Sequence, residues 1–81
     1  MPNYAVRFKG LLFKAHRDRL DAAGIVFESS EPGMQIGSIK TGEPVNTVRV
    51  VAGSETEALE AVREVLVPDD VNFSNWEANG G

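Results

Sequence analysis

The chain has 81 residues, a formal net charge of −4 at pH 7 and no cysteine. This length predicts one domain, residues 1–81, which must be stabilised by packing because no disulfide can form. The lack of cysteine excludes thiolate zinc sites, thiol nucleophiles and dithiol redox motifs. The single histidine, His16, has no neighbouring ligands at metal-site spacing, so we expect neither a metal nor a cofactor.

The apolar runs of the chain are short. The longest are residues 11–13 and 25–27, which are too short to span a bilayer. A secretion signal has a basic stretch followed by an apolar run, and the N-terminus does not show this pattern. We therefore expect a cytoplasmic protein that makes no membrane contact.

The first third of the chain predicts a strand, a helix and a second strand. Apolar and polar side chains alternate over residues 4–9, as in a strand with one buried face. Apolar residues then recur every three or four positions, which predicts a helix over residues 11–23 that ends at Gly24. Residues 25–27 form a β-rich run, and a proline-glycine turn follows at residues 31–33.

The middle of the chain allows two interpretations. Residues 45–52 have the composition of a strong strand. Residues 34–40 form either an extra strand or an irregular approach to that strand, because residues 41–44 carry a second turn signal. A hairpin of two strands and a meander of three strands are both compatible with this pattern.

The last third predicts a helix and a short strand. Ser54 can accept a hydrogen bond from the amide three residues later while Glu57 reaches back to the serine amide, which is the pattern of a helix start. Pro68 follows the end of this helix. Residues 71–74 alternate as a short strand, and we expect residues 76–81 to form a frayed tail.

This order of elements predicts an α+β fold, a ferredoxin-like β-α-β-β-α-β sandwich with two helices on one face of an antiparallel-rich sheet. If the first strand turns its apolar side chains to the helices, Arg7, Lys9 and Arg49 lie together on the other face, which would be basic. The predicted core consists of the inward-facing apolar residues Tyr4, Val6, Phe8, Leu12, Leu20, Ile25, Phe27, Val48, Val50, Leu59, Val62, Leu66, Val71 and Phe73.

The uncovered sheet face favours a protein-binding function. Sheet faces and edges are interaction surfaces, and here Arg7, Lys9 and Arg49 would supply cations. Trp76, the only tryptophan, lies outside the core pattern. It is either an exposed interface anchor or packs across the sheet edge to complete the core. The opening strand, two helices and late strand resemble subtilisin-type propeptides and related inhibitors, which implies docking through a sheet face. We expect a non-enzymatic partner-binding or regulatory module whose partner is another protein. The module itself would be either a monomer or a homodimer formed through a sheet edge or the open face.

A phosphate-binding enzyme is the first alternative. Residues 7–14, between a strand and a helix, resemble the acylphosphatase loop, which implies a phosphate held by Gly10 and Lys14. Lys14 stands where that family has an arginine, and a lysine does not reproduce the bidentate contact. The serines have only His16 as a possible base, and we expect His16 at the surface or boundary of its helix. We therefore expect no catalytic residue and keep an acylphosphatase-like hydrolase or phosphate-binding domain as an alternative.

An RNA-binding module is the second alternative. Cations on an open sheet resemble an RNA-recognition sheet, and the helix after Ser54 resembles the second helix of double-stranded RNA-binding domains. Base-stacking aromatic residues are missing from the predicted face. The helix carries Glu55, Glu57 and Glu60 where that family has lysines, and these charges repel phosphates. We therefore do not expect nucleic acid as the partner.

Overall fold

A computed structural model describes residues 2–33, 35–36, 39–40 and 42–80. This part of the chain forms one four-stranded antiparallel sheet, a separate pair of short strands, two α-helices and a 3₁₀ helix, which confirms the α+β class. The elements in chain order are β1 (Asn3–Lys9), α1 (Lys14–Ala22), β2 (Val26–Glu31), β3 (Gln35–Ile36), β4 (Ile39–Lys40), β5 (Val45–Val51), α2 (Glu55–Leu66), the 3₁₀ helix η1 (Asp69–Asn72) and β6 (Ser74–Gly80).

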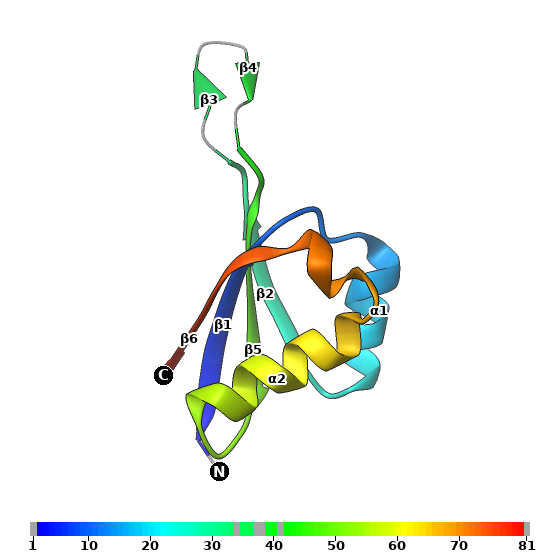
Figure 1. The fold of residues 1–81 in the computed structure, drawn as a ribbon, viewed down its shortest axis with the longest axis vertical. Coiled ribbons are helices and arrows are strands. Elements are labelled where there is room, and N and C mark those ends of the chain that lie inside the picture. Colours follow the sequence, from blue (N-terminus) through cyan, green and yellow to red (C-terminus); the bar gives the residue numbers. More distant parts are fainter. Residues whose placement is uncertain (1, 34, 37–38, 41, 81) are drawn as a thin grey trace.

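The sheet has the strand order β2-β5-β1-β6, and every neighbouring pair is antiparallel. Both α-helices lie on the same side of this sheet and contact each other (Figure 1). The other side of the sheet is the open face. Neither α-helix is long and apolar enough to cross a membrane, and the described residues contain no other α-helix.

The core lies between the inner face of the sheet and the two helices. Val6 on β1 pairs with Val48 on β5, and both are fully buried. Val71 is the one member of the predicted core that the structure contradicts, because it is 80% exposed. It belongs to η1, whose tight turn points it outward, rather than to a strand. The other predicted core residues are confirmed as buried or packed against the core: Tyr4, Val6, Phe8, Leu12, Leu20, Ile25, Phe27, Val48, Val50, Leu59, Val62, Leu66 and Phe73.

Helix α1 begins three residues later than the sequence predicts. Phe13 is its N-cap, and the amide of Phe13 donates a hydrogen bond to Nδ1 of His16 over 3.1 Å. The imidazole thus satisfies one of the free amides at the helix start, a role that glutamate or glutamine fills in a capping box. His16 is only 8% exposed, so the expectation of a surface or boundary residue was wrong. Gly24 follows the helix with φ of 80°, as the sequence predicts.

Helix α2 begins where the sequence predicts. Oγ of Ser54 accepts a hydrogen bond from the amide of Glu57 over 3.2 Å, and Ser54 is the N-cap. The Glu57 carboxylate reaches back to the amide of Gly53, over 2.9 Å, rather than to the serine amide. The bond from the Glu57 side chain therefore ends one residue before the N-cap, whereas in a capping box it ends at the N-cap amide.

Residues 76–80 of the expected frayed tail belong to a strand, and Gly81 lies outside the described residues. Residues 74–80 form β6, which pairs along β1 from Tyr4 opposite Gly80 to Lys9 opposite Ser74. Of the strand expected at residues 71–74, the first two residues belong to the turn η1 and only Ser74 belongs to β6, so the strand begins later than the sequence predicts. Pairing with β1 satisfies backbone groups that a frayed tail would leave to water, and this explains the order of the segment.

The sequence allowed either an extra strand or an irregular approach at residues 34–40, and the described part of this segment adds no strand to the four-stranded sheet. In the described part of that segment, β3 and β4 pair with each other, with Gln35 opposite Lys40. They form a hairpin that projects beyond one end of the sheet (Figure 1). Met34, Gly37 and Ser38 lie outside the described residues.

Candidate partner-binding face

The three cations singled out by the sequence lie together on the open face. Arg7 pairs with Thr47 across β1 and β5, and Arg49 pairs with Ala5. Residues directly opposite each other in an antiparallel pair point to the same face, so Arg7 and Arg49 share one. Lys9 joins them because it is two residues from Arg7 on the same strand. All three are exposed, as a binding role requires.

These cations form a diagonal row rather than a cluster. Lys9 and Arg7 are successive outward residues of β1, and alternate residues of a strand are about 7 Å apart. The next outward position of β1 is Ala5, and Arg49 lies opposite it on β5. Arg49 is therefore the diagonal neighbour of Arg7, at roughly 7–8 Å. The row crosses the two central strands in steps of about 7 Å.

Acidic residues flank this row on the two edge strands. Glu77 on β6 lies opposite Arg7, and the register of β2 turns Glu31 to the same face. Glu28, in the bulged part of β2, accepts a hydrogen bond from Nε of Arg49 as an ion pair. The open face thus carries as many acidic as basic residues. The expectation of a basic face was wrong, because it was based on the central strands alone.

Two of the cations keep their charge available. Among the described residues, Arg49 is the only member of the row with an ion pair. Arg7 faces Glu77 in the strand register, but their charged groups make no ion pair. A partner could therefore meet Arg7 and Lys9 without displacing a salt bridge.

Trp76 lies on the other side of the sheet from these cations. Its ring stacks on Phe8, with ring centroids 4.6 Å apart and an interplanar angle of 22°. The Phe73 ring meets it edge-on at 6.2 Å, and the Arg63 guanidinium of α2 lies 5.5 Å from its centroid. Trp76 is half-buried against the core, so the structure separates it from Arg7, Lys9 and Arg49.

The turn that resembles a phosphate loop has its key groups occupied. The Gly10 amide donates to the carbonyl oxygen of Pro44 over 3.0 Å. Nζ of Lys14 lies 2.9 Å from the Asp18 carboxylate one helical turn later. A Cβ at position 10 would overlap the ring of Phe73, so packing explains the glycine without a ligand. A phosphate would have to displace these contacts, and the phosphate-binding alternative gains no support from them.

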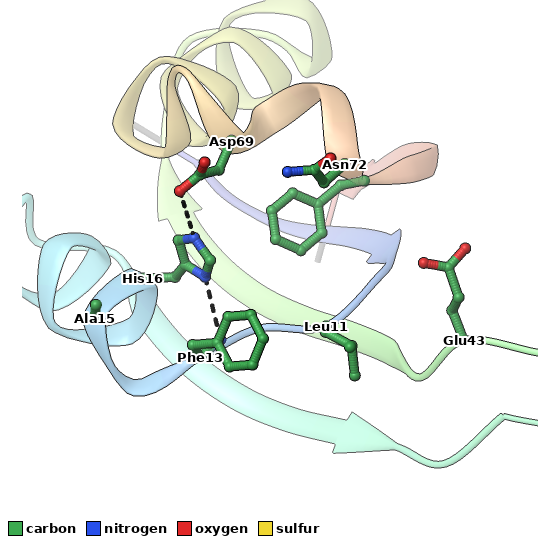
Figure 2. Close-up of a pocket in the computed structure, with 8 residues that line it drawn as sticks. Leu11, Phe13, Ala15, His16, Glu43, Asp69 and Asn72 are labelled. Atoms are coloured by element: carbon green, nitrogen blue, oxygen red, sulfur yellow. Dashed lines mark hydrogen bonds and ion pairs between the residues drawn. The ribbon is translucent and has the colours of Figure 1, made fainter.

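His16 makes a hydrogen bond with each ring nitrogen. Nδ1 accepts from the Phe13 amide, and Nε2 lies 2.9 Å from Oδ2 of Asp69 (Figure 2). Because Nδ1 accepts, the proton must be on Nε2, and the imidazole is the neutral tautomer that donates to Asp69. Nδ1 caps the start of α1 and Nε2 links α1 to η1, so both nitrogens are engaged and neither is left to act as a base toward a serine hydroxyl.

The described residues contain no group of three or more histidine, cysteine, aspartate or glutamate side chains placed to hold a metal ion. The residues that sequence reasoning missed are the acidic flanks Glu28, Glu31 and Glu77, whose position depends on the register of the edge strands. In comparisons with protein-family models, curated proteins and solved structures, none matches this chain.

Proposed function

We propose that this chain is a protein-binding module that holds an extended acidic segment of a partner protein on the open face of its sheet. The observation that carries the proposal is the diagonal row of Lys9, Arg7 and Arg49 on the two central strands. The row is exposed, and within the described residues only Arg49 is already paired with a carboxylate.

The spacing of the row matches an extended chain. Side chains on one side of a β-strand recur at intervals of about 7 Å, which is close to each step of the row. Acidic residues at every second position of the partner can thus meet Lys9, Arg7 and Arg49 in turn. Consecutive acidic residues would point to opposite sides of the partner segment and meet fewer cations.

The acidic edges confine the partner segment to the central strands and give the interaction its selectivity. Glu28 and Glu31 on β2 and Glu77 on β6 repel an acidic segment that strays from the central strands. Repulsion of the wrong register is a common source of specificity in protein interfaces. Exposed ion pairs contribute about 0.2–1 kcal/mol each, so three contacts support a weak, reversible complex of the kind that regulation uses.

A ferredoxin-like domain over residues 1–81 is part of the proposal. The four sheet strands and two helices follow each other as β1, α1, β2, β5, α2 and β6. In space the third sheet strand, β5, lies between the first and second, and the last, β6, lies beside the first. This order supports a sandwich in which the helices cover one face and leave the other for a partner.

Fluorescence anisotropy with two labelled peptides tests the proposal. One peptide alternates glutamate with serine, and the other has the same composition with its glutamates contiguous. We expect the alternating peptide to bind at least about threefold more tightly, and Arg7→Gln and Arg49→Gln each to weaken it by roughly two- to fivefold. Lys14→Gln removes an exposed cation from α1 and serves as the matched control, which should have no effect.

Three results would contradict the proposal. The first is equal affinity for the two peptides, which would mean that spacing is not recognised. The second is equal sensitivity to the Lys14 and Arg7 changes, which would mean that only net charge counts. The third is tighter binding of a labelled single-stranded oligonucleotide, whose phosphates would then be the better match for the row.

A further inference from the structure

A surface hollow of about 550 Å³ lies on the helix side of the molecule, away from the open sheet face. It lies between the loop that leads into α1, the turn η1 and the segment just before β5 (Figure 2). Its walls include Leu11, Phe13, Glu43 and Asp69. Pockets for small molecules commonly have volumes of this order.

The hollow has an apolar surface that the fold leaves uncovered. Leu11 is 62% exposed and Phe13 is 61% exposed, and both line the hollow. The buried ring of Phe73 also lines the hollow. The backbone of Phe13 is held in place by its hydrogen bond to His16, so its ring is presented from an ordered helix cap. This surface can contact an aromatic or aliphatic group.

The charged groups of the hollow are acidic. Among the described residues that line it, Glu43 and Asp69 are charged and none is a lysine or arginine. Asp69 contacts His16 through Oδ2, and its side chain remains 46% exposed. The neutral imidazole of His16 adds no positive charge, because its Nδ1 accepts a hydrogen bond. The hollow therefore favours a positively charged ligand over a negative one.

We propose that this hollow binds a small organic cation with an aromatic or aliphatic body. The ammonium group lies toward Glu43, which is on the side of the hollow opposite Asp69 (Figure 2), and the body packs on Leu11 and Phe13. A cation near the face of the Phe13 ring gains a further electrostatic attraction from the aromatic quadrupole. The site is independent of the proposed partner-binding face, because it is on the opposite side of the sheet.

An NMR titration of the ¹⁵N-labelled full chain with three probes of similar shape tests this site. The probes are 2-phenylethylammonium, the neutral 2-phenylethanol and the anionic 3-phenylpropionate. We expect the ammonium probe to saturate shifts at the amides of Leu11, Phe13 and Phe73, and to bind roughly three- to tenfold more tightly than the alcohol. The anion should give no saturable shift at these amides.

Two substitutions separate charge from apolar contact. Glu43→Gln should weaken the ammonium probe by about two- to fivefold and leave the alcohol unchanged. Phe13→Ala removes only an exposed ring, because the backbone amide makes the helix cap, and it should weaken both probes. Glu60→Gln on the exposed side of α2 is the matched charge control and should change neither.

The proposal is overturned if the ammonium probe shows no saturation up to about 20 mM, or if its shifts map outside the hollow. Equal affinities for the ammonium and the alcohol would also overturn it, since charge would then play no part. An equal effect of the Glu43 and Glu60 substitutions would assign the binding to net charge rather than to this site.

Discussion

Replacing Trp76 by alanine should destabilise the fold without weakening the binding of an acidic segment. Truncation of a fully buried tryptophan or phenylalanine to alanine costs about 3–5 kcal/mol. Trp76 is half-buried, but it stacks on Phe8 and meets Phe73 edge-on. We therefore expect a loss of about 2–3 kcal/mol in the free energy of unfolding.

Urea unfolding followed by far-ultraviolet circular dichroism measures this loss, because the substitution removes the only tryptophan fluorophore. Trp76→Phe is the matched variant. It keeps an aromatic ring against Phe8 and should lose only about 1 kcal/mol. Peptide anisotropy on the same folded samples should give an unchanged affinity for both variants, since Trp76 and the cations occupy opposite faces.

Two outcomes would refute this reasoning. An unfolding free energy within about 0.5 kcal/mol of the unmodified chain in the alanine variant would mean that Trp76 does not pack on the core as described. A folded Trp76→Phe variant with weakened peptide binding would place Trp76 in the partner-binding face, as the sequence suggested.

Three further substitutions test how the fold is held together. Asn46→Ala should lower the free energy of unfolding by about 2 kcal/mol in urea titrations, because the buried amide donates to the Gly10 carbonyl over 2.9 Å; an unchanged midpoint would contradict this contact. Gly10→Ala should cost more than about 1 kcal/mol by the same measurement, since φ at this residue is 145° and the new methyl group would overlap Phe73; a stabilised variant would show that this account of the turn is mistaken. Ser54→Ala should cost about 1 kcal/mol and lower the thermal midpoint, because the hydrogen bond to the Glu57 amide is lost; no change in melting would mean that the cap does not stabilise α2.

The regular elements with a strong local pattern were predictable from sequence. Alternation identified β1, composition identified β5, and the Ser54 to Glu57 pattern located the start of α2. The start of α1 was not predictable from periodicity, because Leu12 continues the apolar spacing of the helix. Leu12 lies outside it because His16, an unusual capping residue, makes Phe13 the N-cap.

The candidate face was only partly predictable. The period of a strand places Arg7 and Lys9 on one side, and this inference needs no partner strand. Predicting the acidic flanks would have required the pairing registers of β2 and β6 with the central strands, which depend on tertiary contacts. Trp76 was misplaced because η1 shifts the last strand three residues along, and a 3₁₀ turn of four residues leaves little trace in the sequence.

Asn46 is a buried polar residue whose position was not predictable from the sequence. Its side chain is fully buried on β5, at a position where the alternation of the strand predicts an apolar residue. It fits because Oδ1 accepts from the Ser30 hydroxyl over 2.8 Å and Nδ2 donates to the Gly10 carbonyl. These partners come from two other segments of the chain, so only the assembled fold satisfies them.

The binding of an acidic strand across β1 and β5 is tested most directly by an amide shift map of the ¹⁵N-labelled chain titrated with the alternating glutamate peptide. We expect the largest saturable shifts at Arg7, Lys9, Thr47 and Arg49, with helix α1 unaffected. Shifts centred on the helices, or none at these strands, would contradict the assignment of the open face as the binding surface.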